Sequence, residues 1–146
     1  MRVRFPNGVE IDALPLRERR DENPDRDFGL YMDPRWAPTW EADLIDWEDF
    51  GLPTDPAVAV AQISAAYRRA ESGERVEIGC IGGLGRTGTV VACMAVLAGV
   101  PADEAVTWVR EHYDPGAVET PEQEAWVIAF ASAENRSRRG PSSGRR

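Results

Sequence analysis

RVEIGCIGGLGRTG, residues 75–88, is the stretch from which the fold is predicted. Its first six residues, RVEIGC, have the length of a strand and predict one. A glycine-rich segment follows, and from Thr87 to Ala98 nearly every position is apolar, which predicts a helix buried on all sides. The stretch therefore predicts a strand that passes through a glycine-rich loop into a buried helix.

The rest of the chain alternates between short strands and helices. Residues 2–11 predict a hairpin that turns at Asn7 and Gly8, and residues 12–27, rich in charge and Pro, predict a loop. Apolar runs at 28–32 and 42–47 predict two further strands. Helices are predicted over 54–72, 101–112 and 120–135, because each begins at a capping residue or a proline. Strands followed by helices indicate an α/β fold with helices packed on a sheet.

Charge divides the chain near residue 135. Residues 136–146 (RSRRGPSSGRR) carry five Arg and no acid, so the net charge of −8 for the whole chain becomes −13 for residues 1–135. We predict one domain over 1–135 and a basic, disordered tail over 136–146. The acidic body argues against nucleic acid as a partner, because a phosphate backbone requires a basic footprint.

The sequence also bears on the compartment. The most apolar stretch, 89–100, has the length of a buried helix and is too short to span a bilayer. No apolar segment follows the first arginines, so no signal peptide is recognised. Cys80 and Cys93 are too few for a disulfide framework, which agrees with a reducing compartment. We expect a cytoplasmic protein with no membrane partner.

The glycine-rich loop has the chemistry of a phosphate site with a nucleophile. A loop that enters a helix N-terminus directs successive backbone N–H groups into one concavity. The planar fork of Arg86 can hold two oxygens of a phosphate. Cys80 lies at the other end of the loop, and both the helix dipole and Arg86 favour its thiolate form. The predicted phosphate loop consists of Ile81, Gly82, Gly83, Leu84, Gly85 and Arg86.

Other interpretations of this loop fit less well. A lone cysteine at a strand end is commonly a small core residue. The Gly-Lys-Ser/Thr ending of a Walker loop is missing, and so is the G-x-G-x-x-G spacing of a dinucleotide-binding turn. A cysteine, five residues, an arginine and then Thr-Gly, between a strand and a helix, is a more specific pattern than either.

Cys80 to Gly88 resembles the C-x5-R-[ST]-G signature of the cysteine-dependent protein tyrosine and dual-specificity phosphatases. The form C-x-G-G-L-G-R is similar to the kinase-associated, Cdc14-like branch and its bacterial relatives. The resemblance covers about residues 28–132. It implies a small, mainly parallel sheet flanked by helices and hydrolysis of phosphate monoesters through a phosphocysteine, without metal or organic cofactor. One departure is Gly79, where the family has a histidine that helps to fix the loop.

The segment WEDFGLP at 47–53 resembles the family's mobile Trp-Pro-Asp loop, with Glu48 in place of the proline. The resemblance implies that Asp49 is the general acid, which the chemistry needs because the leaving oxygen departs more easily once protonated. Spacing alone does not exclude Asp46 or Glu48. From the residues alone, a solvated acidic loop is the more ordinary interpretation.

Two further residues are given roles by the resemblance. Gln123 is similar to the glutamine that positions the hydrolytic water, although Thr-x-x-Gln also matches a capping box. Thr87 corresponds to the hydroxyl that hydrogen-bonds the departing thiolate, although it could simply cap the helix. Cys93 is expected in the core, and His112, the single histidine, is expected to cap a helix end.

Substrate and activity are the last expectations. The neutral Ile81 and Leu84 favour phosphotyrosine or mixed phosphoprotein substrates over highly charged inositol phosphates. No segment resembles the phosphotyrosine-recognition loop, so the chain looks more like the dual-specificity type. The alternative is a phosphate-binding pseudophosphatase, which Gly79 and Glu48 would support, whereas the presence of Cys80, Arg86 and a candidate acid argues against it.

Overall fold

A computed structural model describes residues 1–16, 26–33 and 38–139. Its sheet has five strands in the order β1-β2-β5-β3-β4, and β1 alone runs antiparallel to its neighbour. The mainly parallel sheet that the family resemblance implied is therefore confirmed. The strands are β1 Arg2–Arg4, β2 Glu10–Pro15, β3 Phe28–Tyr31, β4 Ala42–Leu44 and β5 Val76–Cys80.

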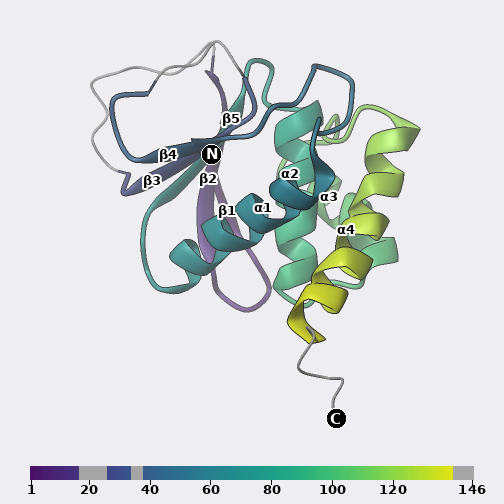
Figure 1. Ribbon diagram of the computed structural model, residues 1–146. Coiled ribbons are helices and arrows are strands. Elements are labelled where there is room, and N and C mark those ends of the chain that lie inside the picture. Colours follow the sequence, from purple (N-terminus) through teal and green to yellow (C-terminus); the bar gives the residue numbers. More distant parts are fainter. Residues whose placement is uncertain (17–25, 34–37, 140–146) are drawn as a thin grey trace.

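The helices lie to one side of the sheet in Figure 1, with α2 at the centre of the helical layer. Helix α2 is buried from Gly85 to Ala95, as its apolar sequence predicted, because the sheet and the other helices surround it. The helices are α1 Pro56–Glu71, α2 Gly85–Leu97, α3 Ala105–His112 and α4 Pro121–Arg139, and a short 3-10 turn, Ala102–Glu104, leads into α3.

Local sequence signals account for several boundaries. The side chain of Asp55 caps α1 by accepting a hydrogen bond of 3.3 Å from the N–H of Val58, and Pro56 occupies the first turn. Gly73, with φ +102°, follows the end of α1, and Gly8, with φ +92°, turns the hairpin between β1 and β2. These predictions from capping residues, proline and glycine are confirmed.

The predicted loop over 12–27 is wrong at its start. Residues 12–15 continue β2 and pair in parallel with β5, from Asp12 opposite Glu77 to Pro15 opposite Cys80. Ile11 and Ala13 alternate inward and are buried, a strand pattern that the charged flanks and Pro15 obscured. Residues 17–25 of that predicted loop lie outside the described residues.

Two helix ends also differ from the prediction. Helix α2 begins at Gly85, before the predicted Thr87, so Arg86 belongs to its first turn. Helix α4 continues to Arg139, past the predicted end at residue 135. The domain boundary at 135 and the disordered tail remain predictions, since residues 140–146 lie outside the described part of the chain.

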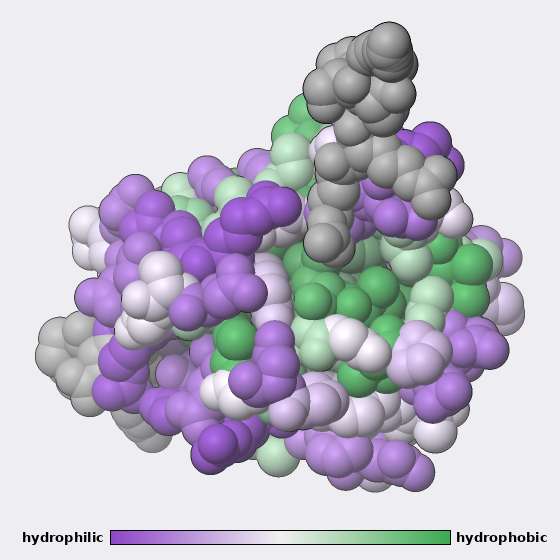
Figure 2. Space-filling model, turned by 90° about the horizontal axis from the view of Figure 1, so that it is seen from below, coloured by the Kyte–Doolittle hydropathy of each residue, from purple (hydrophilic) through white to green (hydrophobic). Residues whose placement is uncertain are grey.

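The topology places the candidate site residues at one edge of the sheet. The carboxyl ends of parallel neighbouring strands meet at the same edge, so Cys80 at the end of β5 lies beside the segment that follows β3. The site lies toward the top of Figure 1, where α2 and α4 begin. Figure 2 looks at the molecule from below, onto the opposite end, where hydrophobic side chains gather in the centre of the view.

Candidate active site

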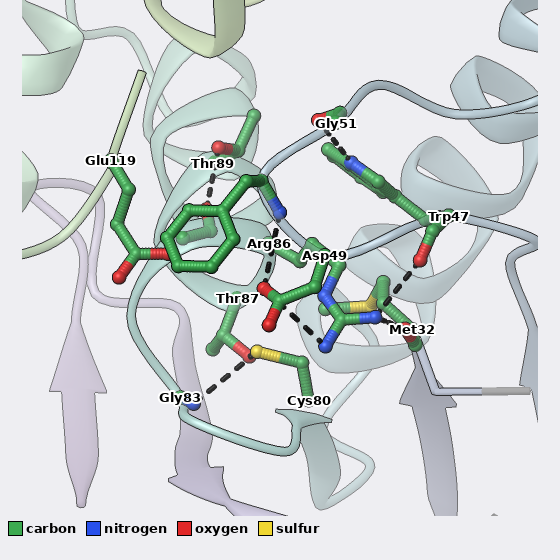
Figure 3. A network of polar contacts seen from close by, with 12 residues as sticks. Met32, Trp47, Asp49, Gly51, Cys80, Gly83, Arg86, Thr87, Thr89 and Glu119 are labelled. Carbon is green, nitrogen blue, oxygen red and sulfur yellow. Dashed lines mark hydrogen bonds and ion pairs between the residues drawn. The ribbon is translucent and has the colours of Figure 1, made fainter. Parts of the chain in front are cut away.

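The loop between β5 and α2 curls around the sulfur of Cys80 (Figure 3). Cys80 Sγ accepts hydrogen bonds from the backbone N–H of Gly83, at 3.2 Å, and from the hydroxyl of Thr87, at 2.9 Å. Gly83 has φ +72°, and a Cβ there would lie 2.7 Å from the backbone nitrogen of Pro15, so only glycine fits. The hydroxyl of Tyr113 donates to the Gly83 carbonyl and fixes the loop from the side of α3.

Arg86 is only 4% exposed, and its guanidinium faces the same space. Nη1 donates hydrogen bonds to two backbone carbonyls, 2.6 Å to Met32 and 2.9 Å to Trp47. Nη2 lies 3.7 Å from a carboxylate oxygen of Asp49. Nε is buried and makes no hydrogen bond with the described residues. Since an unpaired buried donor is costly, Nε is the atom that an anion in the loop would satisfy.

The segment 47–53, called the acid loop below, begins at Trp47 and is anchored by that side chain. This side chain is fully buried, packs on Trp126 with ring centroids 5.5 Å apart, and donates from its ring N–H to the Gly51 carbonyl at 2.8 Å. Phe50, between them, has the left-handed φ of +61°. The tight turn that results brings the Asp49 carboxylate to Arg86.

The structure separates Asp49 from its two competitors. Asp49 makes the ion pair with Arg86 and also accepts a hydrogen bond of 3.1 Å from the N–H of Phe50. Glu48 and Asp46 are exposed and contribute backbone carbonyls to the loop, which accept the N–H groups of Gly51 and Thr54. The geometry therefore joins Asp49 to Arg86, and its role as the general acid stays a prediction.

Gln123 connects α4 to the acid loop. Its side chain is fully buried; Nε2 donates to the Gly51 carbonyl at 3.1 Å, and Oε1 accepts from the N–H of Glu119 at 2.9 Å. Its own N–H donates to the hydroxyl of Thr120 at 3.1 Å. Gln123 therefore takes part in the cap of α4 and also contacts the acid loop, so the two interpretations of this residue are compatible. Thr87, in contrast, lies inside α2 and does not occupy the capping position, which is Leu84.

Sequence reasoning missed Glu119. Its carboxyl group lies against Gly85, where a Cβ in place of the glycine hydrogen would overlap Oε1. Burial raises the pKa of Glu119, the charge of Asp49 raises it further, and Arg86 opposes both. No motif marks this residue, because a local chain reversal at Val118, and not the sequence spacing, brings it to the loop.

Cys93 and His112 do not join the cluster. Cys93 is fully buried in α2, and burial raises the pKa of its thiol well above the ordinary value, so it stays protonated at neutral pH. His112 is exposed at the end of α3, where its ring stacks on Trp108 at 4.2 Å and approaches the carbonyl of that residue. Both agree with the structural roles expected for them.

The described residues contain neither a candidate metal site nor a candidate membrane-spanning helix. These residues contain no group of three or more His, Cys, Asp or Glu side chains placed to hold a metal ion. Within the same ranges, no helix combines the length and the apolar character needed to cross a membrane.

Residues 39–134 match the sequence model of the family described as PTP-SAK, Swiss Army Knife protein, DSP-PTPase phosphatase domain. The chain belongs to this family. Two curated relatives of this PTP-SAK member come from Methanocaldococcus jannaschii, and both are named as uncharacterized proteins. MJECL20 is 36% identical over 112 residues, covering 69% of this chain and 74% of the relative. MJ0215 is 34% identical over 118 residues, covering 73% and 72%.

Solved structures extend the PTP-SAK assignment to the fold. Tk-PTP in its active form superposes with a TM-score of 0.68 at 26% identity, covering 85% of this chain and 91% of the other. Kinase associated phosphatase superposes with a TM-score of 0.70 at 17% identity, covering 90% and 94%. The predicted phosphatase-type α/β fold, with its signature loop between a strand and a buried helix, is confirmed.

Proposed function

We propose that the protein is a phosphoprotein phosphatase, of phosphotyrosine or dual specificity, that acts through a phosphocysteine at Cys80. The observation that carries the proposal is the buried guanidinium of Arg86. It uses Nη1 on two backbone carbonyls, while Nε, buried beside the loop that holds Cys80, has no partner among the described residues. The planar guanidinium can donate to two oxygens of one phosphate group at once, so a bound phosphate would give Nε its missing acceptor.

In the first step the thiolate of Cys80 attacks phosphorus. The S–P bond forms while the bond to the leaving oxygen breaks, and Arg86 and the loop amides stabilise the charge on the equatorial oxygens. Asp49, whose carboxyl group lies beside the same guanidinium, protonates the leaving oxygen. The positive charge that a metal would otherwise supply comes from the guanidinium and the helix N-terminus.

In the second step water attacks the phosphocysteine. Asp49 takes a proton from the water as the O–P bond forms, and the S–P bond breaks to release phosphate and the thiolate. The Thr87 hydroxyl, 2.9 Å from the sulfur, stabilises the departing thiolate. Gln123 positions the water, since its amide reaches the acid loop at Gly51.

The uncharged side chains of the phosphate loop favour a phosphoprotein as the substrate. Apart from Arg86, the loop side chains are Ile81 and Leu84, which carry no charge. A highly phosphorylated small molecule would present further anionic groups to a loop in which Arg86 is the one cation. A single phosphate monoester on a peptide requires only the loop itself.

The competing candidate is a pseudophosphatase, favoured by Gly79 in the place of the family histidine. The deciding experiment is steady-state turnover of para-nitrophenyl phosphate with a chelator present, for the wild type and Cys80→Ser. We expect turnover in the wild type and none in the variant, with tungstate binding retained by both. Comparable turnover in Cys80→Ser would rule out the cysteine mechanism, and no turnover in either protein would favour the pseudophosphatase.

A further inference from the structure

A tyrosine at the end of α3 contacts the middle of the phosphate loop. The hydroxyl of Tyr113 donates a hydrogen bond of 2.5 Å to the carbonyl oxygen of Gly83. Tyr113 is fixed in place, because its N–H donates to the Val109 carbonyl at 2.8 Å and its half-buried side chain packs on the hydrophobic core. The proposed mechanism gives this residue no role, although Gly83 lies between the candidate nucleophile Cys80 and the candidate clamp Arg86.

The direction of this carbonyl also fixes the direction of the next N–H group. In a planar trans peptide group, the C=O and N–H bonds point to opposite sides. The Gly83 carbonyl points toward Tyr113, so the N–H of Leu84 points away from it, into the loop. The inner side of the loop is marked by the N–H of Gly83, which donates to Cys80 Sγ at 3.2 Å (Figure 3). The Leu84 N–H has no backbone acceptor among the described residues.

The next peptide group along the loop is held in a comparable way. The Leu84 carbonyl accepts hydrogen bonds from the N–H groups of Gly88, at 2.9 Å, and Val118, at 3.1 Å. The N–H of Gly85 therefore points to the opposite side, and within the described ranges it too has no backbone acceptor. Two successive N–H groups are thus available to an anion, because the carbonyls that precede them are bound from outside the loop.

The two carbonyls differ in how firmly they are held. The Leu84 carbonyl has two backbone donors, whereas the Gly83 carbonyl has one donor in the part of the chain that the structure describes, the Tyr113 hydroxyl. Gly83 has φ +72° and no side chain to restrain the torsion that rotates this peptide group. A rotated group would present its carbonyl oxygen, the negative end of the peptide dipole, to a phosphate. The orientation of one peptide group therefore decides whether the loop attracts or repels an anion at that point.

We propose that Tyr113 is a positioning residue for phosphate. Its hydroxyl holds the Gly83–Leu84 peptide group in the orientation in which the Leu84 N–H donates to a phosphate oxygen. The inference rests on the proposed phosphatase function and adds to it a residue that touches neither the substrate nor the reacting atoms. A bound phosphate itself favours the same orientation. Loss of the hydroxyl therefore lowers the fraction of free protein that is ready to bind, and the apparent affinity falls by that fraction.

The test compares Tyr113→Phe with Tyr67→Phe. Each variant removes one hydroxyl from a hydrogen bond, and that of Tyr67, on α1, pairs with Asn7 at 2.6 Å, outside the phosphate loop. Tungstate affinity is measured by calorimetry, and KM and kcat are measured on para-nitrophenyl phosphate. We expect Tyr113→Phe to raise the dissociation constant of tungstate and KM by the same factor, about 3- to 10-fold, the scale of one neutral hydrogen bond. The value of kcat should change little, and Tyr67→Phe should match the wild type in all three quantities.

A second measurement separates the orientation of the peptide group from a general effect on the fold. The amide resonance of Leu84 is followed by NMR in isotope-labelled protein. In the wild type we expect tungstate to shift this resonance downfield, because the N–H donates to the anion. In Tyr113→Phe the resonance of the free protein should be displaced or broadened, and saturating tungstate should restore its wild-type position. A residue that only stabilises the fold would not give this restoration.

Three results would overturn the inference. They are a tungstate affinity of Tyr113→Phe equal to that of Tyr67→Phe, a loss of kcat at unchanged KM, and a Leu84 resonance that tungstate does not move in the wild type. The last result needs no variant. Because tungstate binding needs no turnover, a wild type that binds tungstate through Leu84 but does not hydrolyse para-nitrophenyl phosphate would contradict only the proposed function. Normal turnover with an unaffected Tyr113→Phe would contradict only this inference.

Discussion

Arg86 donates a hydrogen bond of 2.9 Å to the carbonyl oxygen of Trp47, so the phosphate loop and the acid loop are joined at one side chain. The same nitrogen donates to the Met32 carbonyl at 2.6 Å, which adds the end of β3 to the junction. Because Arg86 is buried, these charge-assisted bonds form away from water and are strengthened. The guanidinium that is the candidate phosphate clamp therefore also holds the backbone of the loop that carries the candidate acid.

Arg86→Lys is expected to reduce turnover by about a hundredfold or more, the scale of losing a charge-stabilising donor. An ammonium cannot bind two carbonyls in the observed geometry and also present a planar pair of donors to phosphate. The measurement is kcat/KM on para-nitrophenyl phosphate. Arg4→Lys, at a position exposed on β1, is the control. A loss smaller than about tenfold would show that Arg86 is mainly structural.

Thr87→Ala is expected to slow the breakdown of the phosphocysteine more than its formation. The hydroxyl lies 2.9 Å from the Cys80 sulfur and stabilises the thiolate as it departs. A hydrogen bond to a charged group contributes about 1.5–3 kcal/mol, which corresponds to a slowing of about 10- to 100-fold. Rapid-quench measurement should show a larger burst of phosphoenzyme. Thr87→Ser keeps the hydroxyl and should behave nearly as the wild type; equal burst sizes in all three proteins would contradict the assigned role.

Gly79→Ala is expected to destabilise the fold. A Cβ at this position would lie 2.7 Å from Leu16 Cδ2 and 3.3 Å from the Leu14 carbonyl. Overpacking of this kind costs about 1–3 kcal/mol, measured as the free energy of unfolding in urea. Leu16→Ala in the same chain should recover part of the loss. Leu16 therefore lies where a side chain at residue 79 would begin, and unchanged stability in Gly79→Ala would refute this account.

The predicted site residues that sequence spacing alone could group together are those held by local geometry. Cys80, Arg86 and Thr87 share one strand–loop–helix, so their spacing alone brings them together. Asp49 needed the family resemblance as well, because Glu48 and Asp46 have equally suitable side chains. Glu119 could not be found in this way, since its approach depends on the left-handed backbone of the preceding residue.

The contact of Leu16 with Gly79 illustrates the same limit. It arises because β2 continues past its charged residues and lies beside β5, whereas composition predicted a loop there. The pairing of distant strands is decided by packing over the whole sheet, and a single sequence carries little of that information. The departure at Gly79 was therefore visible in the sequence, but the contact with Leu16 was not.

Glu119→Gln is expected to raise the melting temperature at pH 8 and to have little effect at pH 4. The pKa of Glu119 is raised in the folded protein, so the stability contributed by its protonated form is present at low pH and is lost as the pH rises through that pKa. Glutamine removes the unfavourable charge at high pH. Glu122→Gln serves as the control, and a melting temperature lowered by Glu119→Gln at pH 8 would contradict the expected sign.

Asp49→Asn is expected to slow aryl phosphates in proportion to the pKa of the leaving phenol, because a general acid matters most when the leaving group is poor. Glu48→Gln should leave this dependence unchanged, since the Glu48 side chain is exposed and its backbone carbonyl makes the loop contact, with the N–H of Gly51 at 2.9 Å. The Asp49 carboxylate instead lies 3.7 Å from Arg86 Nη2, on the side of the loop that faces Cys80 in Figure 3. Rates are measured for both variants over a series of phenols at fixed pH. An unchanged dependence in Asp49→Asn, together with a steeper one in Glu48→Gln, would assign the acid role to Glu48 and would show that the acid loop turns differently during catalysis.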